Sequence, residues 1–212
     1  MSFRDDLGNL CFYEIRLQMY SMAVPGISEF TLLRNAQRVY GQYGIGLKFV
    51  NGQSLLLSRQ QQADLEVVNG SCEWSTLSAD QQQVHNLRDD YRFRPKEIRI
   101  YFVNEMRKPD GGQLNGCGGH LPGRPAVTVA ASSTPWTFGH ELGHLLLGAS
   151  FRPVHPDDRN NLMHAPTSEI TGNPPILTPT QVTAIKASRY CLIPADDIPM
   201  LLRLISPRRS TR

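Results

Sequence analysis

Four of the six histidines lie in one short stretch, "TFGHELGHLLLGASFRPVHPDDRNNLMH", which spans residues 137–164. His140, Glu141 and His144 form a His-Glu-x-x-His run within it. Residues four apart share one face of a helix, so both imidazoles could bind one ion at about 2 Å from each nitrogen, the distance that zinc requires. Glu141 would project beside that ion and could take a proton from a water bound there. The run therefore predicts a catalytic metal site.

A catalytic zinc site needs a third protein ligand and an open position. Gly148 would let the chain leave the helix and turn back. His155 lies 11 residues after His144, far enough to reach the same ion. We therefore predict His140, His144 and His155 as the ligands of one catalytic Zn²⁺. Glu141 is then the catalytic general base.

Other residues could supply the third ligand. Asp157 and Asp158 follow His155 closely, and His120 and His164 are more remote alternatives. A His-Glu-x-x-His run can also arise by chance on an amphipathic helix, where its histidines would be half-exposed polar residues. The third histidine, the glycine exit and an upstream strand favour the metal site over this interpretation.

The helix that carries the run is expected over about 135–147. Thr134 can cap its start, and Pro135 falls in the first turn, where proline costs least. Gly139 and Gly143 lie inside this helix and should each cost about 1 kcal/mol relative to alanine. Close approach of another element to the helix would explain both glycines.

The surrounding pattern predicts an α+β fold with one mixed sheet and helices mainly on one side. Alternating or buried apolar runs indicate four strands, and helical spacing with capping residues indicates two further helices. The expected strands cover 10–22, 44–50, 96–106 and 126–132, the helices cover 27–43 and 178–193, and a glycine-rich loop covers 110–125. Region 51–95 is expected to be a surface excursion with a helical piece around 79–91.

The composition is that of an ordinary globular protein rather than a nucleic-acid or membrane protein. The chain has 212 residues, 40% of them hydrophobic, and a net charge of +3. This balance argues against nucleic acid as a partner, and no apolar run is long enough to cross a bilayer. Asp5 and Asp6 stand where a signal peptide would be basic. We expect a cytoplasmic location, although export without a cleaved signal would leave the same pattern.

The four cysteines, at positions 11, 72, 117 and 191, have no C-x-x-C spacing and so do not indicate a cysteine zinc knuckle. Without a signal peptide, we expect reduced thiols. Cys117 lies just before the strand that leads to the histidines. A thiolate there could reach a metal and block it, but a buried structural thiol is the simpler expectation.

The stretch "HELGHLLLG…H…NLM" resembles the active-site region of zinc metallopeptidases of the metzincin type. The resemblance is specific over 126–164. It implies that His140 and His144 are helix ligands, that His155 takes the third-ligand place, and that Met163 lies in a turn at about 161–164 below the metal. Two departures mark a divergent relative: Gly148 comes one residue later, and His155 five residues later, than the family pattern places them.

The resemblance implies a zinc-dependent endopeptidase with a protein or peptide substrate. It implies one metallopeptidase domain over 1–205, which would leave 206–212 as a disordered basic tail. The family mechanism has Glu141 deprotonate a zinc-activated water that attacks the peptide carbonyl. Strand 126–132 could hold an extended substrate by strand addition, and the loop after Met163 would set specificity. The alternatives are an inactive zinc-binding homologue that acts as a binding module, and a zinc hydrolase of a non-peptide amide. The sequence does not indicate an oligomeric state.

Overall fold

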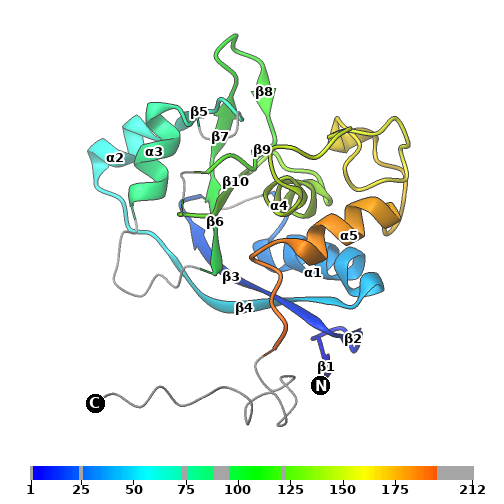
Figure 1. The fold of residues 1–212 in the computed structure, drawn as a ribbon. Coiled ribbons are helices and arrows are strands. Elements are labelled where there is room, and N and C mark those ends of the chain that lie inside the picture. The colour runs from blue at the N-terminus through cyan, green and yellow to red at the C-terminus, as the bar shows by residue number, and fades with distance from the viewer. Residues whose placement is uncertain (1, 24–25, 73–75, 88–95, 121–122, 195–212) are drawn as a thin grey trace, which may run out of the picture.

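A twisted five-stranded sheet forms the centre of the molecule (Figure 1). The computed structural model describes residues 2–23, 26–72, 76–87, 96–120 and 123–194. The sheet order is β4-β3-β6-β10-β9. The first four strands are parallel, and β9 pairs antiparallel with β10. The strands are β3 (Tyr13–Ser21), β4 (Ile45–Ser54), β6 (Glu97–Val103), β9 (Gly116–Cys117) and β10 (Ala126–Ala130). The predicted mixed sheet is therefore confirmed.

Three helices cover one face of this sheet: α1 (Glu29–Tyr40), α4 (Thr137–Leu147) and α5 (Pro179–Ala187) (Figure 1). Two shorter helices, α2 (Arg59–Asp64) and α3 (Ala79–Asn86), lie beyond the sheet on the other side. The α+β class with helices mainly on one side is confirmed. Region 51–95 is more regular than expected, because β4 runs on to Ser54 and both small helices follow it.

Short elements complete the chain. They are β1 (Phe3–Arg4), β2 (Leu10–Cys11), β5 (Val67–Asn69), β7 (Glu105–Arg107), β8 (Gln113–Leu114), and the single-turn helices η1 (Gly41–Tyr43) and η2 (Thr167–Glu169). Strands β5, β7 and β8 form a second, three-stranded sheet. The predicted loop over 110–125 is wrong in this detail, because it holds both β8 and β9. Two-residue strands give too little alternation to be recognised from sequence.

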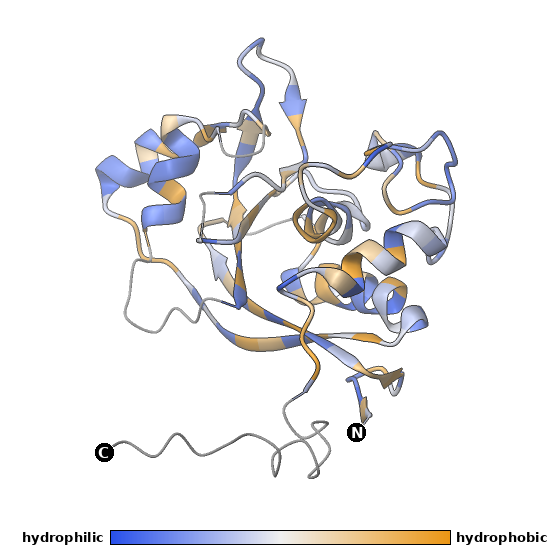
Figure 2. Ribbon diagram, viewed as in Figure 1, coloured by the Kyte–Doolittle hydropathy of each residue, from blue (hydrophilic) through white to orange (hydrophobic). Residues whose placement is uncertain are grey.

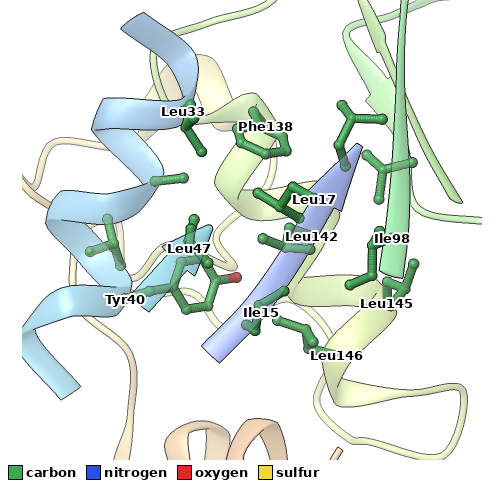
Figure 3. Close-up of a cluster of buried hydrophobic side chains, with 14 of the residues drawn as sticks. Ile15, Leu17, Leu33, Tyr40, Leu47, Ile98, Phe138, Leu142, Leu145 and Leu146 are labelled. Carbon is green, nitrogen blue, oxygen red and sulfur yellow. The ribbon is translucent and has the colours of Figure 1, made fainter. Parts of the chain in front are cut away.

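The main core lies between the sheet and helices α1 and α4. Successive strand residues point to opposite faces, so Ile15 and Leu17 of β3 face the helices while Tyr20 faces α3. In Figure 3, Phe138 and Leu142 of α4 pack between α1 and the strands. Both side chains are fully buried, which stabilises the fold by about 1.5–3 kcal/mol each. In Figure 2, apolar residues gather on α4 and the strands, whereas α2 and α3 are mostly polar.

Capping residues set the helix ends. Ser28 accepts a hydrogen bond from the Thr31 N–H at the start of α1. Thr178 forms a capping box ahead of α5, with Pro179 in the first turn. Helix α4 differs from the expectation in two ways. It begins at Thr137 rather than near 135, and no side chain caps its start. Thr134 instead donates its N–H to the Thr137 hydroxyl.

Two sequence expectations fall partly or wholly on residues outside the described ranges. The helical piece around 79–91 is seen as α3 up to Asn86, and residues 88–91 lie outside. The basic tail over 206–212 also lies outside. Within the described part of the chain, no helix combines the length and apolar character that a membrane span requires.

Candidate metal centre

Helix α4 carries three of the four predicted site residues. His140 and Glu141 are buried, with exposed fractions of 3% and 8%, and His144 is half-buried. Phe138 and Leu142 fix the helix against the core. Because His140 and His144 are one turn apart on the same face, both rings point away from that core into one cleft.

His155 joins these two histidines after the chain leaves α4. Gly148 has a φ of 81°, a conformation that glycine adopts without strain, and the chain turns there. The Nε2 atoms of His144 and His140 lie 3.0 Å apart, and those of His155 and His144 lie 3.1 Å apart. Each histidine offers one ring nitrogen to a group whose members all lie within 4.8 Å of one another. The histidine triad matches the His-Glu-x-x-His…His pattern in which metzincins hold zinc.

The donor set fits a tetrahedral zinc ion. Three nitrogens at about 2.0–2.1 Å from one ion stand roughly 3.3 Å apart in a tetrahedral arrangement, close to the observed contacts. The His140 Nδ1 atom lies 2.8 Å from the Leu162 carbonyl oxygen. A carbonyl can only accept, so Nδ1 carries the proton and Nε2 is left as the lone-pair donor. His140 is thus held in the tautomer that a metal ligand needs.

Desolvation favours the neutral form of the three imidazoles. Desolvation lowers the pKa of His140 to about 4, with the neighbouring His155 and His164 adding to the effect. It lowers the pKa of His144 still further and that of the more exposed His155 as well. Neutral imidazole is the form that binds a metal ion.

Met163 lies buried directly below the histidine-bearing helix. Its Sδ atom approaches Gly143 so closely that a Cβ there would collide with it. The Asn161 side chain accepts from the Met163 N–H at 2.8 Å and is bonded to Gln181 of α5. The backbone turns here, since the His164 N–H donates to the Asn161 carbonyl. The chain thus makes a turn at Met163, and its assignment as the methionine turn of the family remains a prediction.

Glu141 lies between α4 and the edge strand β9. Burial raises the pKa of its carboxyl group to about 8, although a hydrogen bond from the Gly118 backbone N–H opposes this shift. A Cβ on Gly116 would lie 2.7 Å from Glu141 Cγ, and one on Gly118 would lie 2.8 Å from His144 Cβ. Glycine is therefore required where β9 and the residue after it cross the helix.

A cleft of about 740 Å³ opens over these side chains. One wall is the segment from Gln113 to Gly119, which includes β9, and the opposite wall comes from the segments around His155 and Thr167. β9 forms the edge of the five-stranded sheet beside the cleft, whereas β10 is paired on both sides. The expectation that strand 126–132 holds substrate is therefore wrong. It lacks a free edge, because β9 covers it.

The alternative third ligands do not join the histidine group. The Asp158 carboxylate accepts the Asn160 N–H, and His164 Nδ1 lies 3.0 Å from the Pro156 carbonyl. The His120 ring packs edge-on against Tyr190. Among the described residues, neither Asp157 nor any of these belongs to a cluster of three potential ligands.

The cysteines differ from the expected reduced state. Cys72 and Cys117 form a disulfide, while Cys11 and Cys191 are free and buried. Cys117 therefore offers no thiolate to the metal centre. The sequence could not reveal this pair, because the two positions are 45 residues apart and their contact depends on the fold. Paired cysteines are typical of oxidising compartments, and the cytoplasmic location remains a prediction.

Several residues that shape the site gave no recognisable sequence signal. The Leu162 carbonyl and the Gly118 N–H act through the backbone, so their side chains do not mark them. Lys108 and Arg152 line the cleft, but isolated basic residues in loops look like ordinary surface charges. Only the run of glycines hinted that a backbone segment lies against the site.

No protein-family model matches this chain, and no curated protein matches it in sequence. Its fold is similar to that of metalloproteinase-II from Bacteroides fragilis, with a TM-score of 0.56 and 17% sequence identity. The match covers 82% of this chain but 52% of that one, so the chain spans about half the length of the Bacteroides protein.

Two archaeal structures are more weakly similar. Archaemetzincin from Methanopyrus kandleri gives a TM-score of 0.49 at 13% identity and covers 82% of this chain and 94% of its own. Archaemetzincin from Archaeoglobus fulgidus gives a TM-score of 0.44 at 12% identity, and the match covers 80% of this chain and 99% of the archaeal chain. The chain therefore shares the fold of the Bacteroides metalloproteinase, and the histidine triad within it could hold a metal ion such as zinc.

Proposed function

We propose that this protein is a zinc-dependent endopeptidase that hydrolyses peptide bonds in protein or peptide substrates. One observation carries the proposal: three imidazoles converge at one point of an open cleft, with a buried carboxyl group on the same helix beside them. In this assignment His140, His144 and His155 hold one zinc ion. A purely structural zinc site has no need of Glu141.

A zinc ion held by His140, His144 and His155 would supply acidification of a water molecule and polarisation of a carbonyl group. Glu141 would accept the proton at its carboxylate and transfer it to the departing amine. The Gly118 N–H donates a hydrogen bond to this carboxylate and holds it beside the histidines. Leu162 and Met163 hold the histidine helix from below.

The edge strand β9 supplies the peptide-binding surface in this proposal. It is antiparallel to β10 through one edge, and its other edge borders the cleft. An extended peptide can add to such an edge through main-chain hydrogen bonds that do not depend on its sequence. The peptide carbonyl would then lie between Glu141 and the three histidines.

The test combines metal content with hydrolysis of a peptide mixture. We expect about one zinc per chain in the wild type and in Glu141→Ala, whereas His155→Ala should bind clearly less. Hydrolysis by Glu141→Ala should fall by about 10²–10⁴-fold, since the general base is lost. Asp157→Ala is the matched control for His155 and should keep both zinc and activity.

Each contrary result points to a different interpretation. Wild-type cleavage by Glu141→Ala would remove the proposed role of that residue. Full zinc content without cleavage of any peptide would indicate a binding module or a hydrolase of non-peptide amides. Equal zinc in His155→Ala and wild type would move the third ligand to another residue.

A further inference from the structure

Two cationic side chains lie on separate parts of the cleft rim. Lys108 follows β7 on the hairpin that leads through β8 to β9, and Arg152 lies on the segment between α4 and His155. Figure 1 shows the β7–β8 hairpin above α4 and the segment after α4 to its side. A peptide that runs along β9 past the three histidines would therefore meet positive charges that come from two different elements.

Both charges remain available to a ligand. Arg152 Nη1 donates to the Ala149 carbonyl at 2.8 Å and to the Phe151 carbonyl at 2.6 Å. These bonds hold the guanidinium in place, yet a carbonyl does not neutralise it. Within the described ranges, neither Lys108 nor Arg152 has a carboxylate partner within 4.0 Å. Both residues are exposed.

The rest of the cleft does not compensate these charges. Apart from Lys108, Arg152 and the histidines, its described lining is neutral except for Glu141. Glu141 is buried under β9 and engaged by the Gly118 N–H. A cleft lined mainly by one sign of charge concentrates ligands of the opposite sign. The described lining therefore carries two cations and one buried carboxyl group, before the charge of a bound metal is added. Asp110, which follows Lys108 by two residues, lines the adjoining pocket instead.

We propose that the cleft selects peptides with acidic side chains near the scissile bond, with Lys108 and Arg152 as specificity-determining residues. This inference rests on the proposed peptidase function and names its substrate class. Lys108 pairs with a carboxylate as a mobile point charge, whereas the anchored Arg152 presents a planar fork that can bind a carboxylate through two hydrogen bonds. Neither residue touches the reacting atoms.

The experiment compares matched peptides in which glutamates flanking the cleavage site are replaced by glutamines. The zinc-loaded wild type should show a kcat/KM ratio of about two- to tenfold in favour of the glutamate peptide, the scale expected of solvent-exposed ion pairs. The ratio should fall towards one in Lys108→Gln/Arg152→Gln and reverse in Lys108→Glu/Arg152→Glu. It should also shrink at 1 M salt, where the Debye length is about 3 Å.

Lys48→Gln is the matched control, because Lys48 is an exposed cation on β4 at the opposite edge of the sheet. It should keep the wild-type ratio. Thermal unfolding of every variant separates loss of selectivity from loss of fold. Equal kcat/KM values for the two peptides in the wild type would overturn the inference while leaving the peptidase assignment intact.

A binding measurement covers the case in which no peptide is cleaved. Fluorescence anisotropy with labelled peptides and the zinc-loaded Glu141→Gln protein reports affinity without turnover. Tighter binding of the glutamate peptide, lost in Lys108→Gln/Arg152→Gln, would support the charge-selective cleft even if the peptidase function failed. Equal affinities, or a preference retained in the double variant, would overturn it.

Discussion

At the scale of single residues, Gly139 and Gly143 inside α4 differ in how closely their surroundings approach the backbone. A Cβ at Gly139 would make ordinary contacts, at 3.4 Å to Leu162 and 3.5 Å to Ala36. A Cβ at Gly143 would collide with Met163 and lie 3.3 Å from the Tyr40 hydroxyl. The close approach of another element that the sequence suggested is therefore found at Gly143, whereas Gly139 has only ordinary van der Waals contacts.

This difference makes Gly139→Ala and Gly143→Ala a matched pair. Gly139→Ala should leave the free energy of unfolding unchanged or raise it by up to about 1 kcal/mol, because alanine favours the helix. Gly143→Ala should lower it by about 1–3 kcal/mol through overpacking against Met163, and zinc affinity should fall with it. Urea unfolding and zinc titration measure both effects. Equal effects of the two substitutions would contradict this account of Met163.

At the scale of elements, the edge strand β9 is the part that assembles the site. It shields β10, borders the cleft and contacts α4 through Gly116, and Gly118 just after the strand makes a further contact with α4. The Cys72–Cys117 disulfide ties this strand to the segment between β5 and α3. A two-residue strand gains little from its own ladder, so a covalent tether contributes to holding it over the helix.

We expect Cys72→Ser to lower the free energy of unfolding by about 2–4 kcal/mol, the usual contribution of a disulfide. Peptide cleavage should weaken in parallel as β9 loosens. Reductant should destabilise the wild type by a similar amount and leave Cys72→Ser unaffected. Cys191→Ser is the control, because this free cysteine lies outside the pair and the variant should keep the response to reductant. A wild type that is insensitive to reductant would argue against the bond.

At the scale of the whole molecule, the sheet separates two different interiors. The face towards α1 and α4 is apolar, whereas the face towards α3 also buries polar groups. His85 of α3 is among them: its Nε2 lies 3.2 Å from the Thr128 hydroxyl, and its ring stacks on Tyr101. Burial, followed by the charges of His120 and Arg99, lowers the pKa of His85 to about 3.

The depressed pKa makes folding sensitive to acid. Between the ordinary histidine pKa of 6.5 and about 3, the unfolded chain binds a proton at His85 that the folded protein does not. Stability from this site is therefore fully present above pH 6.5 and declines as the pH falls, by roughly 1–2 kcal/mol between pH 6.5 and 5. His85→Gln should lack this part of the slope. Denaturant titrations of the wild type and His85→Gln between pH 5 and 6.5 measure the free energy of unfolding of each protein. The contributions of the other histidines cancel in the difference between the two proteins. Identical slopes of unfolding free energy against pH would refute the prediction.

The sequence alone determined those features that depend on neighbours along the chain. The four-residue spacing of His140 and His144 places both on one helix face, and capping residues such as Ser28 and Thr178 mark helix starts through local hydrogen bonds. The alternation in the long strands predicted the sheet and the fold class. These interactions extend over only a few residues, so a local pattern is enough to reveal them.

Only the tertiary structure decided which distant segments meet. The return of the chain after Gly148 brings His155, and not Asp157, to the helix pair, although its role as a ligand remains a prediction. The contacts of β9 with α4, the Cys72–Cys117 pair and the placement of Lys108 and Arg152 on one cleft also join segments far apart in sequence. Such contacts follow from how the sheet and helices pack together, and no local spacing encodes them.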